Sequence, residues 1–182
     1  MKYWLMADPH LGHENVMVKA CGRPEDYSNR ILSALSKTVA PGDVFICLGD
    51  ICFGKEIEWH TKMLGIPADG TLGALRPGVR RWLVIGNHDK KSISWYLDHG
   101  WDFAAESFTL EIFGHRILFS HVPKPDTGYT LNIHGHFHNT DHHNHEPELV
   151  AIKNDKQYLL VSENVSYQPM NLQTIIEKLP RR

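Results

Sequence analysis

Five short apolar runs of this chain each end at residues whose side chains commonly bind metal ions. Each run has the length and composition of a buried strand. The polar segments that follow the runs are Asp8-Pro9-His10, Gly49-Asp50, Gly86-Asn87-His88-Asp89, His121 and Gly135-His136-Phe137-His138. Because the carboxyl ends of strands in an open α/β sheet form its ligand crevice, we expect these side chains to converge on one sheet edge.

Apolar periodicity predicts the elements that carry this edge. The expected strands cover 3–7, 44–48, 82–85, 108–113, 117–120, 129–133, 149–152 and 158–161, with hairpin turns at Gly114-His115 and Asn154-Asp155. We expect Ser28 to cap a helix that Pro41-Gly42 ends and whose apolar face carries Ile31, Leu32, Leu35 and Val39. Further helices are expected near 57–64, 93–97 and 172–179. Residues 65–78 are expected to form an irregular loop. Strands that alternate with helices early and pair in hairpins late predict a mixed α/β structure.

Length and charge exclude several classes of protein. At about 150 residues per domain, a chain of 182 residues is expected to form a single domain over 1–182. A net charge of −2 argues against an extended nucleic-acid surface and against binding to an anionic membrane. No apolar run approaches the roughly 18 residues of a membrane helix. The three cysteines form no Cys-x-x-Cys pair, and no signal peptide is evident, so a cytoplasmic location is expected.

The candidate donors offer carboxylate, imidazole and amide groups and no thiolate. They are Asp8, His10, Asp50, Asn87, His121, His136 and His138. This chemistry suits Mn²⁺, Fe, Ni²⁺ or Zn²⁺ better than a structural zinc site or a calcium cage. One tetrahedral ion cannot use seven donors, whereas two ions that share a bridging carboxylate can. Such pairs, about 3.5–4 Å apart, activate water and stabilise both oxygens of an in-line displacement.

In order and spacing, these five segments resemble the motifs of the calcineurin-like metallophosphoesterases. The resemblance covers positions 8–138, and Gly12-His13-Glu14-Asn15 is most similar to the small bacterial and phage-type members. It implies a four-layer α/β/β/α sandwich, in which two mixed sheets pack face to face with helices outside.

The resemblance also implies roles for individual residues. One metal would be held by Asp8, His10, Asp50 and His138. The other would be held by Asp50, Asn87, His121 and His136, with Asp50 as the bridge. A hydroxide between the ions would attack phosphorus, and His88 would act as the catalytic residue at the phosphate and the leaving oxygen. Two divalent ions are expected, with Mn²⁺ first and Fe, Ni²⁺ or Zn²⁺ as alternatives.

The expected reaction is hydrolysis of a phosphodiester or phosphomonoester. Protein phosphatases of this family carry a second Asp and an Arg shortly after the Gly-Asp motif, whereas Ile51-Cys52-Phe53-Gly54 stands here. A phosphodiesterase is therefore favoured over a protein phosphatase, and the expected partner is a small phosphate ester, with nucleotide-like esters among the candidates. No carboxylate that orients His88 is identifiable from the sequence.

Two other functions compete with this one. His136-Phe137-His138-Asn139-Thr140-Asp141-His142 nearly matches the HxHxDH signature of metallo-β-lactamase-type hydrolases, with one residue too many. That hypothesis leaves Asp8, His10 and Asp50 unexplained. A non-enzymatic scaffold on the same fold is the second alternative, although such scaffolds typically lose ligands that are present here.

The remaining histidines and lysines receive weaker interpretations. His13 follows the first motif and either lines the pocket or ends a loop, and His134 is expected to pack behind the ligands. The histidines of the polar loop 141–147, together with His60, His99 and His115, are expected to be structural or solvated. Lys90 and Lys91 lie near the expected crevice, where solvation is the default.

Overall fold

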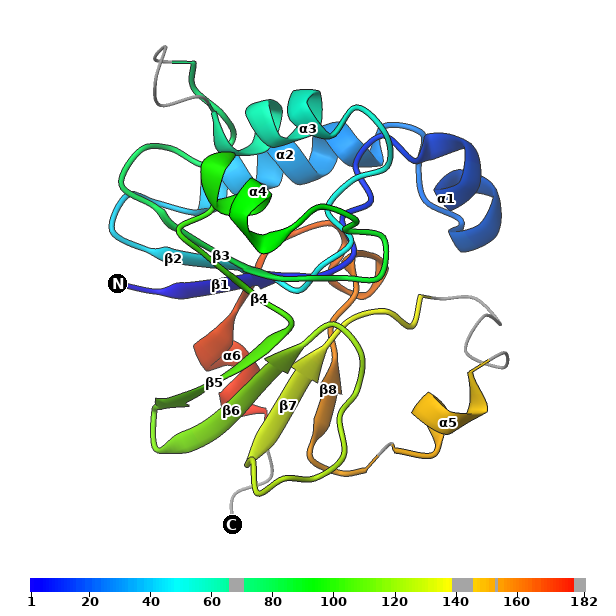
Figure 1. Ribbon diagram of the computed structural model, residues 1–182, viewed down its shortest axis with the longest axis vertical. Helices are drawn as coiled ribbons and strands as arrows, with labels where there is room; N and C mark the ends of the chain where they lie inside the picture. The colour runs from blue at the N-terminus through cyan, green and yellow to red at the C-terminus, as the bar shows by residue number, and fades with distance from the viewer. Residues whose placement is uncertain (66–70, 139–145, 153, 179–182) are drawn as a thin grey trace.

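The computed structural model describes residues 1–65, 71–138, 146–152 and 154–178. Within them the strands form two mixed sheets that pack face to face, and helices flank them (Figure 1). The predicted α/β class and its two mixed sheets are confirmed.

The first sheet has the order β4-β3-β2-β1-β9. Its strands are β1 (Tyr3–Met6), β2 (Val44–Cys47), β3 (Arg80–Val84), β4 (Phe103–Ala105) and β9 (Met170–Asn171). The strands β1 to β4 are mutually parallel, and β9 pairs antiparallel to β1. The second sheet has the order β5-β6-β7-β8. Its strands are β5 (Ser107–Ile112), β6 (His115–Ser120), β7 (Leu131–His134) and β8 (Gln157–Leu159).

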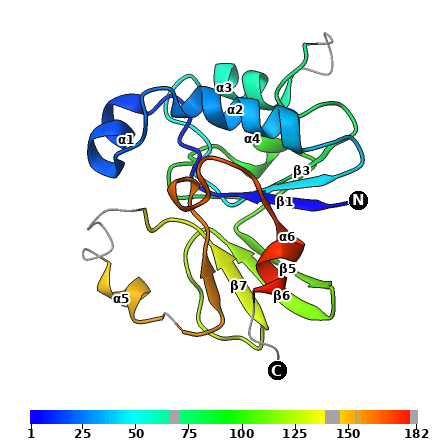
Figure 2. The ribbon, with the colours of Figure 1, turned by 180° about the vertical axis from the view of Figure 1, so that it is seen from behind.

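Helices cover the outer face of the first sheet. In Figure 1 this face carries the helices α2 (Tyr27–Thr38), α3 (Glu56–Leu64) and α4 (Ile93–Asp98). The helices α1 (Glu14–Cys21) and α5 (Pro147–Val150) lie on one side of the molecule in both ribbon views (Figures 1 and 2). A 3-10 helix, η2 (Ser162–Val165), and the terminal α6 (Leu172–Glu177) complete the described elements.

The side chains of the first sheet alternate between its two faces and so contribute to two separate apolar cores. Met6 packs with residues from the outer helices, whereas Leu5 packs with residues from the second sheet. Successive side chains of a strand point to opposite faces, so each strand supplies both cores. Ile175 of α6 joins the core between the sheets, and Ile31 of α2 joins the outer core.

The register of the parallel strands brings their carboxyl ends to one edge. Met6 pairs with Cys47, and Cys47 with Leu83, so the following polar segments start at the same level. The pairing continues past the strands, because the Asp8 amide donates to the Gly49 carbonyl at 3.1 Å. A Cβ on Gly49 would lie 2.7 Å from Gly86 Cα, so this approach of the two loops needs glycine.

The predicted hairpin over 149–152 and 158–161 is wrong. Residues Pro147–Val150 form α5, and β8 pairs parallel to β7. Proline at the start of this segment has the backbone angle that suits a first helical turn. A turn does form after Asn154, whose side-chain oxygen accepts a hydrogen bond from the Lys156 amide at 2.8 Å.

The predicted capping role of Ser28 is also wrong. Helix α2 begins at Tyr27, and Ser28 lies inside its first turn. The Ser28 hydroxyl instead donates to Glu14 at 2.7 Å and accepts from the Gly12 amide at 3.2 Å. Ser28 therefore stabilises the loop that follows the first motif and leads into α1.

Four elements were not predicted: α1, β4, η2 and β9. The expected features at 66–70, 141–145 and Leu179 lie outside the described residues. Among the described helices, none is long and apolar enough to cross a bilayer.

Candidate metal centre

Several predicted donors have a backbone conformation that L-amino acids rarely adopt. The φ angles are 52° at Asp8, 45° at His10, 55° at Asp50 and 74° at His136. Such left-handed conformations cost free energy and persist only where the surrounding structure enforces them. Here the sharp bends directly after the strands turn the side chains of both sheets toward one another.

We call Asp8, His10 and His138 the buried half-site, because Asp8 and His10 are buried and His138 is partly buried. The Nε2 atoms of His10 and His138 lie 3.1 Å apart, and His138 Nε2 lies 3.8 Å from Asp8 Oδ1. Donors that share an ion with bonds of about 2.0–2.2 Å are separated by roughly 3–4 Å. The three side chains therefore stand at distances that suit one shared cation.

The second group, Asn87, His121 and His136, is here called the open half-site, because Asn87 is exposed. Asn87 Oδ1 lies 2.7 Å from His121 Nε2 and 3.0 Å from His136 Nδ1. The two imidazole nitrogens are 3.2 Å apart. This group is as compact as the first.

Asp50 stands between the two half-sites. Its Oδ2 atom lies 3.5 Å from His10 Nε2 and 3.5 Å from His121 Nε2. Its other oxygen accepts a hydrogen bond from the His88 amide at 2.8 Å, which fixes the carboxylate plane. The structure thus brings all seven predicted donors together, and their assignment as ligands stays a prediction.

Three of the histidines have their outer nitrogen fixed by an acceptor. His121 Nδ1 donates to the Leu48 carbonyl at 2.8 Å, and His138 Nδ1 donates to Glu163 Oε1 at 3.0 Å. His136 Nε2 contacts Glu146 Oε2 at 2.5 Å. A proton held on the outer nitrogen leaves the inner nitrogen with its lone pair toward the centre. The tautomers are therefore those that bind a cation.

The electrostatics of the centre also fit a cation. Asp8 Oδ1 is buried and, among the described residues, accepts no hydrogen bond. Burial and the nearby charge of Asp50 raise the pKa of Asp8 well above its usual range. Burial lowers the pKa of His10, as does His138, and it lowers the pKa of His121 to about 4. A bound cation would compensate the buried carboxylates and requires the neutral imidazoles that burial favours.

A buried ion pair that sequence reasoning missed supports the buried half-site. Glu163 Oε1 accepts from His138 Nδ1 and also from Arg23 Nε at 2.9 Å. The Arg23 guanidinium donates further to the carbonyls of Asp8 and Pro9, at 2.8 and 2.9 Å. Burial alone would raise the pKa of Glu163, but the hydrogen bonds from His138 and Arg23 hold it at about 2. The pair thus links the loop that carries Asp8 and His10 to η2.

Two further carboxylates, those of Glu146 and Asp89, make contacts around the donors that the sequence did not predict. Glu146 accepts from His136, as described above, and precedes α5. The Asp89 carboxylate accepts from the amides of Asp50 and Gly86 at 2.8 Å and from Ile51 at 3.1 Å. Asp89 therefore holds the second and third loops together. The spacing of the motif places Asp89 near the site, whereas nothing in the sequence connects Glu163 to His138.

The remaining predicted residues lie around the donors. The exposed His88 ring contacts the His10 ring edge-on, with centroids 5.4 Å apart. Within the described part of the chain no hydrogen bond holds the His88 imidazole. His13 lines the same cavity of about 440 Å³, whereas His134 is buried and does not line it. The Lys91 ammonium lies over the Trp95 ring, 5.8 Å from its centroid.

Comparison with known proteins is consistent with this architecture. The calcineurin-like phosphoesterase family model matches residues 1–176. An uncharacterized protein of Methanocaldococcus jannaschii is 27% identical over 99% of this chain and 92% of its own length. The crystal structure of a protein of unknown function from Aquifex aeolicus aligns over 97% of this chain and 98% of that chain, with a TM-score of 0.68 and 24% identity.

A weaker likeness, to Yfce, a phosphoesterase from E. coli, has a TM-score of 0.43 and 14% identity over 75% of this chain and 69% of that chain, and carries no argument. The family match sets aside the metallo-β-lactamase alternative, and the resemblance of the five motifs is confirmed. The chain belongs to the calcineurin-like phosphoesterase family.

Proposed function

We propose that this protein is a two-metal hydrolase of phosphate esters, with phosphodiesters favoured over phosphoproteins. The observation that carries the proposal is the common direction of the histidine lone pairs. Three imidazoles keep their outer nitrogen on Leu48, Glu163 or Glu146 and turn the inner nitrogen to the space around Asp50. Phosphate-ester hydrolysis is the activity for which the family is named.

In the proposed arrangement Asp8, His10 and His138 hold one cation, Asn87, His121 and His136 hold the other, and Asp50 contacts both. Two bound divalent cations supply positive charge for the phosphate oxygens and lower the pKa of the attacking water. Oxygen and nitrogen donors without thiolate favour Mn²⁺, with Fe, Ni²⁺ or Zn²⁺ as alternatives.

His88 is the proposed catalytic residue. It lies beside His10 but outside both groups of donors, and its backbone amide orients Asp50. An exposed imidazole there can donate a proton to the leaving oxygen or a hydrogen bond to phosphate. Proton donation matters most for a strongly basic leaving oxygen.

The test compares wild-type protein with His88→Ala, after chelation and after addition of Mn²⁺. We expect the chelated wild type to be inactive and added Mn²⁺ to restore hydrolysis of nitrophenyl and alkyl phosphodiesters. His88→Ala should bind the same two equivalents of Mn²⁺ in calorimetry and lose about 10²–10⁴-fold on alkyl esters, with a smaller loss on nitrophenyl esters.

Three outcomes would contradict parts of this proposal. Full activity in a verified metal-free sample would overturn the metal mechanism. Two bound metals without turnover on any ester would favour the scaffold alternative. Loss of metal in His88→Ala would make His88 a ligand rather than an acid.

A further inference from the structure

The cavity beside the candidate metal centre has one polar and one apolar wall. Five of the seven donors form the polar wall: His10, Asp50, Asn87, His136 and His138. Helix α1 forms the other, where Val16, Met17 and Ala20 line the cavity. Val16 and Ala20 are four positions apart, so they occupy the same face of the helix. Val16 is 46% exposed although it is large and apolar. Exposed apolar surface at a cavity is typical of a ligand-binding wall.

An aromatic pair continues this wall. The His13 ring stacks on the Phe53 ring, with centroids 4.0 Å apart and an interplanar angle of 10°. His13 lines the cavity, and its ring centroid is 5.7 Å from that of the donor His10. Phe53 is 51% exposed. The pair therefore places aromatic ring surface next to the donor His10, and the exposed Phe53 extends this surface beyond the cavity lining.

The charge of the cavity restricts what lies against this wall. Asp50 and Glu146 contribute carboxylates to the lining, and the described lining residues include no Lys or Arg. Residues 139–145, which precede Glu146 in the chain, contain no Lys or Arg in their sequence either. Phosphate groups that carry additional negative charge are usually recognised by such basic side chains. The proposed cations would hold the phosphate itself, and the described lining beyond the donors offers no basic side chain for a second charged group on the substrate.

We propose that the site selects monoanionic phosphodiesters with a flat aromatic group, such as an aryl ring or a nucleobase, on the ester oxygen that is not cleaved. The aromatic group packs against Phe53, His13 and Val16 while the phosphate lies at the donors. This inference rests on the proposed phosphoesterase function and adds a specificity to it. Phe53 and Val16 act as specificity-determining residues and do not touch the reacting atoms.

The test keeps the leaving group constant and varies the other ester group. Four p-nitrophenyl phosphates are compared: the monoester, the methyl diester, the phenyl diester and the thymidine 5′-diester. Stacking of a base on an aromatic side chain is commonly worth about five-fold or more in affinity. We expect kcat/KM for the phenyl and thymidine diesters to exceed that for the methyl diester by at least about five-fold. Phe53→Ala should lower kcat/KM for the phenyl and thymidine diesters more than for the methyl diester, so that this preference falls below about two-fold.

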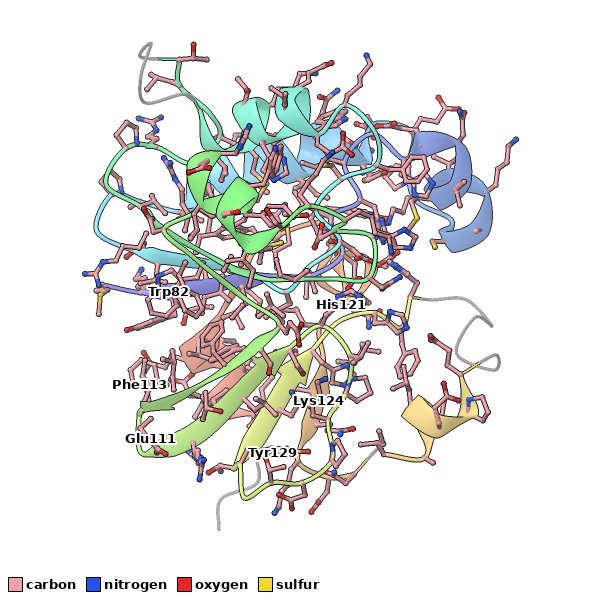
Figure 3. All side chains as sticks on the ribbon, viewed as in Figure 1. Trp82, Glu111, Phe113, His121, Lys124 and Tyr129 are labelled. Carbon is pink, nitrogen blue, oxygen red and sulfur yellow. The ribbon has the colours of Figure 1, made fainter. Side chains whose placement is uncertain are left out.

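Phe113→Ala is the matched control. Phe113 is 51% exposed, as Phe53 is, and Figure 3 shows it at the far end of the second sheet from His121. This variant should keep the wild-type preference. If the wild type hydrolyses the methyl and phenyl diesters equally well, the specificity proposal is overturned while the phosphoesterase function stands. An equal loss on all four esters in Phe53→Ala also overturns it.

A binding measurement separates the two proposals if no ester is hydrolysed. Diphenylphosphinate and dimethylphosphinate are monoanions without a cleavable ester bond. Calorimetry on the Mn²⁺-loaded protein should give at least about five-fold tighter binding of the diphenyl compound, and Phe53→Ala should remove the difference. That result without turnover would overturn only the enzymatic function. Equal binding of the two phosphinates would overturn the specificity.

Discussion

The buried and the open half-site differ in the surroundings of the carboxylates that accept hydrogen bonds from their histidines. In the buried half-site the carboxylate that accepts from His138 is Glu163, whose side chain is 4% exposed and paired with Arg23. In the open half-site the carboxylate that accepts from His136 is Glu146, whose side chain is 36% exposed. A carboxylate behind a ligand fixes its orientation and raises its basicity, and it does so more strongly where water is excluded. Two histidines only two residues apart are thus held with unequal rigidity.

The two supports also differ in what they connect. Arg23 and Glu163 are 140 residues apart, and their ion pair connects the loop that carries Asp8 and His10 to η2. Glu146 lies ten residues from His136, at the start of a four-residue helix. We therefore expect the buried half-site to bind its cation more tightly and to depend more on the intact fold. The open half-site should exchange its cation with solvent more readily.

The largest effect is expected for Asp50→Ala, which removes the carboxylate between the half-sites. One side chain would contribute charge to both cations, so both equivalents should bind far more weakly. Activity should fall by at least about 10³-fold, because metal-derived stabilisation of the transition state is lost. Calorimetric titration with Mn²⁺ checks the binding, with Asn87→Ala as the comparison that should weaken mainly one equivalent. Tight binding of two equivalents by Asp50→Ala would refute the bridge.

Glu163→Gln should have the next largest effect. It keeps the size of the side chain but removes the charge that pairs with Arg23 and accepts from His138. Loss of such a support behind a ligand typically lowers metal affinity about 10–100-fold, and here only the tighter equivalent should change. Breaking a buried ion pair lowers the free energy of unfolding by about 3–5 kcal/mol. Because the amide oxygen of Gln still accepts a hydrogen bond, we expect a loss near the lower end of this range.

A surface pair and a pH titration serve as controls for Glu163→Gln. Glu58 pairs with Lys62 at 2.6 Å on the exposed face of α3, so Glu58→Gln should change the stability far less than Glu163→Gln. The pKa of Glu163 is lowered in the folded state, so its stabilisation is present above about pH 4.5 and is lost as the pH falls toward 2. The metal-free wild type should therefore lose more stability across that range than the variant. Parallel pH profiles of unfolding would contradict this role.

Much of the fold and of the donor set was predictable because it depends on local patterns. Apolar runs identified the strands of both sheets that precede the donors, and the order of the motifs indicated the family. The failures lie where local signals are short. Pro147 begins a helix in a segment whose apolar residues also suit a strand. Ser28 has the side chain of a helix cap but hydrogen-bonds Glu14 instead.

The supports of the two half-sites could not be predicted in the same way. Arg23 is a single charged residue before Pro24, a context that in sequence suggests an exposed loop. Its burial follows from the arrangement of β1, α1 and η2, which only the fold determines. The same is true of Glu163, since no periodicity relates it to His138. Sequence patterns thus predicted the donors, whereas the residues that orient them depend on long-range packing.

Glu146→Gln should have the smallest effect, and it tests whether burial ranks the two supports. The Gln side chain keeps an oxygen that can accept from His136, and solvent screens the lost charge. Stability should change by less than about 1 kcal/mol. Only the weaker metal equivalent should be affected, by less than about ten-fold, below the loss in Glu163→Gln. Both variants are titrated with Mn²⁺ under identical conditions, so they differ only in which of the two carboxylates has been replaced by an amide. If Glu146→Gln lost more affinity than Glu163→Gln, burial would not determine how strongly each histidine is supported.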